Sequence, residues 1–146
     1  MGVRDRLRLM PFAGDGVPGA VDPETGESWD RLNVLGHMDE FLPFWMDQMR
    51  RARMGRSTIG RSEEGYAARR RAIDGGRERG ERELRRRVDA ACGRLLLVLG
   101  NLRAEDLDLP LEHNRMGRIT LAEAIERFLV GHLEAHCAQL ADSTPG

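Results

Sequence analysis

The chain has 146 residues, of which 23 are basic and 24 acidic, so its formal net charge is −1. This length suits one domain that buries a core without disulfide staples. The balanced charge argues against a nucleic-acid-binding protein, because such proteins normally carry a basic excess on one face. We therefore expect one domain over residues 1–146 with no nucleic-acid partner.

The cysteines and the N-terminus bear on the compartment of the protein. Cys92 and Cys137 form no CxxC pair, which argues against a zinc knuckle and a disulfide framework. Reduced thiols in the cytoplasm are the simplest interpretation. The N-terminus MGVRDRLRLMPFAG carries charges through its only apolar part, unlike a signal peptide. No uninterrupted run of about 18 apolar residues is present, so no membrane span is predicted.

The first half of the chain predicts loops around one long helix. A short segment over residues 3–10 is a candidate helix, and residues 11–27 gather Pro, Gly, Asp and Thr as loops do. Residues 28–54 have helical spacing with apolar side chains on several sides, as expected near the centre of a bundle. Residues 55–76 are polar and glycine-punctuated, which predicts a loop followed by an exposed helical stretch.

The second half predicts two more long helices. Apolar residues recur at alternating spacings of three and four over residues 84–102. Residues 103–118 then form a turn with room for a little extended structure. The last helix opens at the T-x-x-E capping box of Thr120 and Glu123 and runs to about residue 141.

Three long helices with almost no strand signal predict an all-α fold of the helical-bundle type. The core bundle is expected over residues 28–141, after a short N-terminal segment and loop over residues 1–27. The first helix of a four-helix bundle would then be short or truncated. Either the chain starts part-way into that helix, or a second subunit covers the exposed apolar surface, so a homodimer is one expectation.

Two histidines lie one turn apart in the stretch GHLEAHCAQL. His132 and His136 continue an apolar stripe, so both rings project the same way and could hold one ion. His37, in NVLGHMDEF, is the natural third ligand because it lies mid-helix among apolar residues. For each histidine alone, a hydrogen-bonded core or edge residue is the simpler interpretation. For all three together a metal is favoured, because clustered buried imidazoles are costly unless something binds them.

Other polar groups have simpler interpretations. His113, in PLEHNRMG, has no helical partner at ligand spacing and is expected on a surface loop. Cys137 points about 100° away from its histidine neighbour around the helix and is expected to be a small buried apolar side chain. Glu134 is a carboxylate that could orient a ring. The arginine runs RRARMGR and RELRRR are expected to be solvated faces.

The combination of W..LNVLGHMDEF, a long middle helix, a G.ITLAEAI lead-in and a final HLEAHCAQL resembles the DinB-like superfamily over roughly residues 28–141. This superfamily implies a four-helix bundle of the DinB/YfiT-like type. By this resemblance His37, His132 and His136 correspond to the metal triad, which usually holds zinc or nickel. Proteins similar to the mycothiol-dependent maleylpyruvate isomerases tend to carry Glu at the position of His132, so this chain is more similar to the three-histidine DinB type.

The resemblance implies a metal-dependent thiol S-transferase. Its substrates would be a low-molecular-weight thiol, such as mycothiol or bacillithiol, and a small electrophile. The three-histidine site would activate the thiol, because a metal lowers a thiol's pKa. No Ser/His/Asp or Cys/His nucleophile is evident in the chain. The alternative is a non-catalytic DinB-like metal-binding or protein-interaction module, with residues 55–76 as its partner surface.

Overall fold

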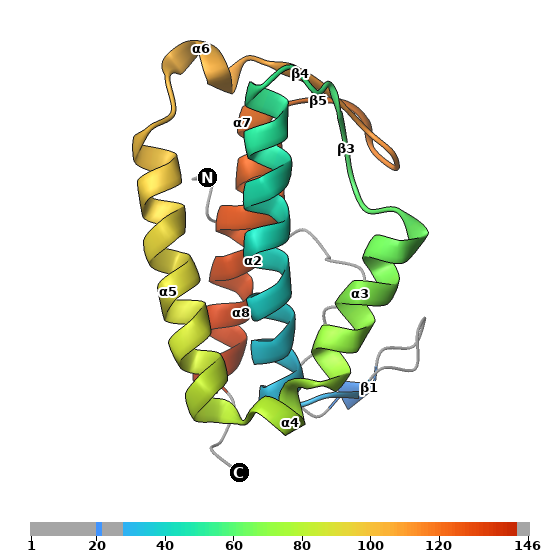
Figure 1. Cartoon of the computed structure of the whole chain (residues 1–146), viewed down its shortest axis with the longest axis vertical. Coiled ribbons are helices and arrows are strands. Elements are labelled where there is room, and N and C mark those ends of the chain that lie inside the picture. Colours follow the sequence, from blue (N-terminus) through green and yellow to red (C-terminus); the bar gives the residue numbers. More distant parts are fainter. Residues whose placement is uncertain (1–19, 22–27, 143–146) are drawn as a thin grey trace.

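The structure is a computed structural model that describes residues 20–21 and 28–142. The short helix expected over residues 3–10 lies outside the described residues, and so does most of the loop expected over residues 11–27. Within the described ranges the protein is mostly helical, as predicted. The long helices run side by side, with the small strands gathered at their ends (Figure 1).

The three long helices predicted from the sequence are confirmed. The helical elements are α2 (Arg31–Arg53), α3 (Glu63–Asp74), α4 (Gly76–Arg79), α5 (Glu81–Gly100), α6 (Ala104–Leu107), α7 (Leu121–Ala124), the π-helix η1 (Ile125–Val130) and α8 (Gly131–Asp142). The strands are β1 (Ala20–Val21), β2 (Ser28–Trp29), β3 (Thr58–Ile59), β4 (Pro110–His113) and β5 (Gly117–Thr120). In the described ranges, none of the helices combines the length and apolar character needed to cross a bilayer.

Helix α2 begins three residues later than predicted, because β2 pairs antiparallel with β1. Asp30 caps the helix: its carboxylate accepts hydrogen bonds from the backbone N–H groups of Leu32 and Asn33, both at 3.0 Å. In return, the Asn33 side chain accepts from the Asp30 N–H at 2.9 Å. This reciprocal cap satisfies N–H groups that the first helical turn leaves without partners, and it sets the start of the helix that carries His37.

Two glycines let α2 approach the α3–α4 segment closely. A Cβ atom on Gly36 would lie 2.4 Å from the carbonyl oxygen of Ala72, and one on Gly76 would lie 2.3 Å from the carbonyl oxygen of Leu32. Only glycine allows backbones to come this near. The rest of α3 is largely solvent-facing, with Ile73 as its buried residue, which confirms the exposed helical stretch predicted within residues 55–76.

A small sheet is the main departure from the all-α prediction. β4 and β5 form an antiparallel hairpin in which Leu111 lies opposite Ile119, and β3 pairs parallel with β4. Side chains alternate along β4, with Leu111 and His113 buried and Glu112 exposed. Strands of two to four residues are too short for a clear period-two pattern, so the sequence predicted only a little extended structure here.

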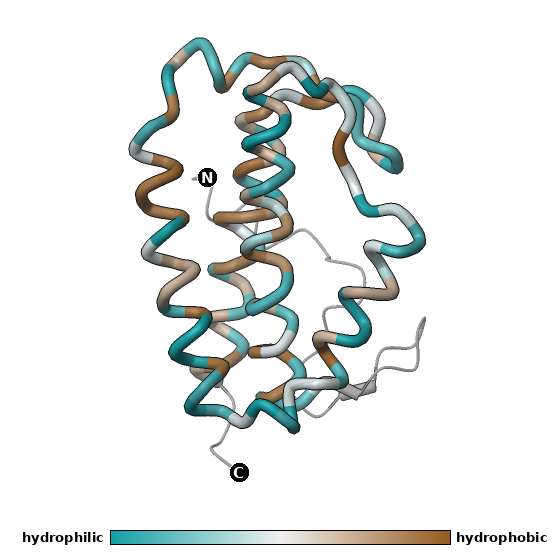
Figure 2. Tube along the Cα trace, viewed as in Figure 1, coloured by the Kyte–Doolittle hydropathy of each residue, from teal (hydrophilic) through white to brown (hydrophobic). Residues whose placement is uncertain are grey.

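The core lies around α2, which contacts α3, α5, η1 and α8. The predicted stripe of α5 is buried through Leu84, Val88, Ala91 and Leu95. Figure 2 shows apolar stretches along α2, α5 and the final helical segment, whereas α4 and much of α3 are hydrophilic. Helix α2 therefore lies at the centre of the core, and α3 packs on it with most of its own surface outside the core.

The final helical segment begins and continues differently from a regular helix. The Thr120 hydroxyl oxygen accepts from the Glu123 N–H at 3.2 Å, as the predicted cap requires, but the Glu123 carboxylate contacts that same hydroxyl group at 3.3 Å. Residues 125–130 then form the π-helix η1 immediately before α8. A π-segment inserts extra backbone into a turn and often lies at a functional site. Here it precedes His132 by two residues.

Candidate metal centre

The three predicted ligands come together in the structure. His37 from α2 and His132 and His136 from α8 are all buried, with exposed fractions of 1%, 8% and 1%. One ligand nitrogen from each ring lies within 4.8 Å of the other two. The Nε2 atoms of His37 and His132 are 3.1 Å apart. The three side chains could therefore hold one metal ion.

The spacing of one pair of these nitrogens suits a bound ion. Two nitrogens bound to zinc at about 2.0–2.1 Å in tetrahedral geometry lie about 3.3 Å from each other, close to the distance between His37 and His132. A direct N–H···N hydrogen bond has a similar length, but it joins two rings, whereas an ion engages all three. Neutral imidazole nitrogens suit zinc, nickel, copper and iron. The chemistry of the three donors and the spacing of this pair are thus compatible with a divalent transition metal.

Gln139 orients one of the rings. Its side-chain oxygen contacts the Nδ1 atom of His136 at 2.9 Å. Because an amide oxygen only accepts, Nδ1 carries the proton and the Nε2 atom of His136 carries the lone pair. Such a partner fixes both the tautomer and the ring plane of a ligand. Sequence reasoning did not single out Gln139, although its spacing of three from His136 was an available signal.

Aromatic side chains enclose the histidines. Phe41, one turn after His37, stacks on His132 with ring centroids 4.1 Å apart. Trp29 of β2 is fully buried and lies edge-on to His37 at 5.3 Å and parallel to His136 at 6.3 Å. These rings restrict rotation of the imidazoles and keep solvent from them. Sequence reasoning placed Trp29 in the helix predicted over residues 28–54, whereas it lies in β2, so its contact with the histidines was missed.

A positive charge lies behind the aromatic wall. The guanidinium carbon of Arg69, on α3, is 5.5 Å from the ring centroid of Trp29, as in a cation–π interaction. The contact holds the outer helix α3 against β2. It also brings the charge of Arg69 to the far side of the Trp29 ring from the histidines, a role that sequence reasoning did not give to this segment.

The two carboxylates that follow His37 face away from the centre. Asp39 accepts two hydrogen bonds from Arg87 of α5, at 2.9 and 3.0 Å. Glu40 pairs with the buried Arg61 at 2.6 Å. Both ion pairs tie α2 to neighbouring segments. The centre is thus built from imidazole nitrogens.

His113 is buried rather than exposed on a loop, so that prediction is wrong. Its exposed fraction is 7%, and its ring stacks on Phe128 with centroids 4.9 Å apart. The Nδ1 atom accepts from the backbone N–H groups of Arg115 and Met116, both at 3.1 Å. Burial lowers the pKa of His113. The alternation of β4 turns this side chain inward, away from the three-histidine cluster.

Neither cysteine has the surroundings of a nucleophile. Cys137 is exposed, which contradicts the expected burial, because the residue after His136 faces outward from the helix. Partial desolvation and the carboxylate of Glu134 raise the pKa of the Cys137 thiol. Burial raises the pKa of the half-buried Cys92. Thiols with raised pKa are mostly protonated at neutral pH and react slowly. Both cysteines are free, as predicted.

Fold and site together define a mostly helical protein in which three buried histidines could hold a metal ion. No family model, curated protein or solved structure matches this chain. Its function is therefore best inferred from the chemistry of the histidine centre.

Proposed function

We propose that the protein is a DinB-like four-helix-bundle metalloprotein in which His37, His132 and His136 bind one zinc or nickel ion. The observation that supports this is the convergence of three buried ring nitrogens, from two different helices, within 4.8 Å of one another. Helical bundles commonly build metal sites from inward side chains on facing helices. Three protein ligands also leave a coordination position for an exogenous group, as catalytic sites do.

The proposed activity is the transfer of a thiol sulfur to a small electrophile. When bound, the metal supplies a Lewis acid that lowers the pKa of a thiol ligand. Because both cysteines of the chain have raised pKa values, the reacting thiol is taken to be an external cosubstrate. The resemblance to the DinB-like superfamily implies a low-molecular-weight thiol of the mycothiol or bacillithiol class. A sulfur–carbon bond forms, the leaving group departs with its electron pair, and the thiol proton passes to solvent.

The protein contributes position and shielding to this chemistry. The Gln139 amide holds the lone pair of His136 on Nε2. Phe41 stacks on His132, and Trp29 packs on the other two rings, so the imidazoles keep one arrangement. A site whose ligands are locked by neighbours loses little freedom when it binds its ion.

Two measurements test the proposal. The tag-free protein, purified without chelating resin or added metal, is expected to contain about one transition-metal ion per chain by elemental analysis. It should then conjugate mycothiol or bacillithiol to a general electrophile such as 1-chloro-2,4-dinitrobenzene, and removal and return of the metal should abolish and restore turnover. Absence of stoichiometric metal overturns the proposed centre. Metal without turnover assigns the chain to the non-catalytic metal-binding class instead.

A further inference from the structure

A second site lies on another part of the molecule, between the C-terminal halves of α2 and α5 and the helix α6. It is a groove of about 740 Å³, and small-molecule sites commonly have volumes of about 300–1,000 Å³. Residues of α2 that line it, such as Pro43, Asp47 and Arg50, recur at spacings of three and four and form one helix face. His37 instead contacts His132 of α8, so a ligand in the groove would displace no metal ligand.

The groove carries a positive charge that its own acidic residues do not cancel. Four arginines and two aspartates line it, an excess of two positive charges. Both aspartates are already paired: Asp47 contacts Arg50 at 2.8 Å and Arg51 at 2.9 Å, and Asp106 contacts Arg53 at 3.3 Å. The acidic side chains thus hold neighbouring arginines in place.

The other two arginines come from different segments and face the same hollow. Arg94 lies on α5, and Arg103 lies just before α6. Neither makes an ion pair within the described part of the chain. Arginine runs usually form solvated faces, but these two converge on a groove from positions nine residues apart in the sequence. A guanidinium fork without a carboxylate partner is suited to bind a carboxylate or a phosphate in two-point contact.

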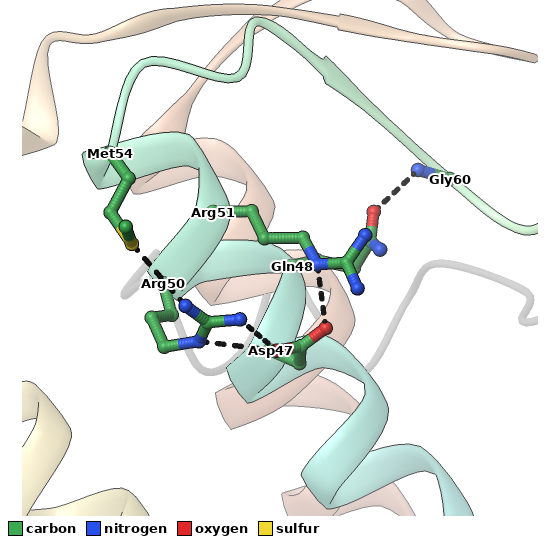
Figure 3. Close-up of polar contacts among 6 residues, drawn as sticks. All are labelled: Asp47, Gln48, Arg50, Arg51, Met54 and Gly60. Carbon is green, nitrogen blue, oxygen red and sulfur yellow. Dashed lines mark hydrogen bonds and ion pairs between the residues drawn. The ribbon is translucent and has the colours of Figure 1, made fainter.

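The rest of the lining includes an apolar surface. Met46, Met54 and Val98 contribute side chains to the groove, and Met54 has an exposed fraction of 76%. Figure 3 shows Arg50 held between Asp47 and Met54, whose sulfur accepts a hydrogen bond from Arg50 Nη1 at 3.3 Å. Thioether side chains adapt to irregular apolar ligands. One groove therefore offers cationic groups beside an apolar wall.

We propose that this groove binds an amphipathic organic anion, with a carboxylate or phosphate head group on an apolar body of medium-chain length. Arg94 and Arg103 bind the head group, and Met46, Met54 and Val98 contact the body. The ligand class follows from the two uncancelled charges and the apolar lining, and it is independent of the metal proposed for the histidine centre.

Calorimetric titration of the full chain at low salt tests this assignment. The probes are octanoate and octyl phosphate, both below their micelle concentrations, and octyltrimethylammonium serves as the charge-reversed control. We expect saturable binding of one anion per chain for at least one of the two head groups, and no binding of the cation. Which anion binds more tightly identifies the head group that the arginines prefer.

Matched variants locate the binding. The double variant Arg94→Gln/Arg103→Gln removes both uncancelled charges and should weaken binding at least tenfold, because hydrogen bonds to charged groups are lost. The control, Arg82→Gln/Arg85→Gln, removes two exposed arginines of α5, the helix that carries Arg94, from positions outside the groove, and it should leave affinity within twofold of wild type. Met54→Gln retains an acceptor for Arg50 and should weaken octyl-chain binding several-fold.

Three results would overturn the assignment. The first is the absence of saturable binding of either anion. The second is equal affinity for the anion in the two double variants. The third is that the wild-type chain binds no anion and forms a dimer, and that this dimer dissociates when Arg94→Gln/Arg103→Gln is introduced. The last result would assign the groove to a second copy of the chain. Metal content should be unchanged in every groove variant. Failure of the anion-binding assignment would therefore not affect the proposed metal centre, and failure of the metal centre would not affect the proposed groove.

Discussion

The Nε2 atoms of His37 and His132 lie 3.1 Å apart, although 95 positions separate these residues in the sequence. We predict that His37→Ala and His132→Ala each reduce bound metal from about one ion per chain to a small fraction, because sites with only two protein ligands are weak. Elemental analysis after dialysis against metal-free buffer measures this. His113→Asn is the matched control, because His113 is also buried but lies outside the cluster. Full metal content in both ligand variants would place the ion elsewhere.

Gln139 provides a finer test of the same centre, because it touches a proposed ligand without being one. Gln139→Leu removes the acceptor on His136 Nδ1 and should lower metal affinity by about 10- to 100-fold. Gln139→Glu retains an acceptor oxygen at the same reach and should restore most of that affinity. Competition with a chromophoric chelator gives the affinities. Equal affinity in the Leu variant and wild type would show that the amide does not orient the ring.

The histidine centre could be predicted because its residues obey two rules that act along the sequence. A spacing of four places His132 and His136 on one helix face, and the apolar neighbours of His37 indicate an inward position. Trp29 could not be found this way. Trp29 belongs to a two-residue strand and pairs with Ala20, nine residues upstream, so its burial depends on tertiary contacts.

The errors have a similar origin. His113 has polar sequence neighbours, yet the alternation of a four-residue strand turns it into the core, where two backbone N–H groups bind its ring. Cys137 was expected to be buried, but its side chain points away from that of His136 on α8 and is exposed to solvent. Helix faces were predictable from period and polarity. The sequence did not predict which face of an element contacts another element, because that depends on how the elements pack.

The close contact between α2 and α3 leads to a stability prediction. Gly36→Ala would place a methyl group 2.4 Å from the Ala72 carbonyl oxygen, and both elements would have to shift, so we expect a loss of about 1–3 kcal/mol in the free energy of unfolding. Gly93→Ala is the matched control, since its Cβ meets nothing within 4 Å. In a helix that change should add about 0.5–1 kcal/mol. Urea unfolding measures the stability of both variants. Equal changes in the free energy of unfolding would contradict the close approach of α2 to α3.

The final prediction concerns the pH dependence of stability. Burial, aided by the positive charge of Arg127, lowers the pKa of His113 in the folded protein. In the unfolded chain this imidazole has a pKa of about 6.5. Below that pH the unfolded state takes up a proton that the folded state resists, so stability falls as pH falls, whereas above it both states are neutral and His113 adds no pH dependence.

His113→Asn isolates this contribution. An asparagine oxygen can accept from the backbone N–H two residues on, as His113 does, but it does not titrate. Urea unfolding at pH 7.5 and 5.5 with a chelator present gives the loss of stability on acidification for each protein. The other three histidines are common to both, so their effects cancel in the comparison. We expect a smaller loss in the variant, and an equal loss would show that His113 takes up its proton as readily in the folded state as in the unfolded chain.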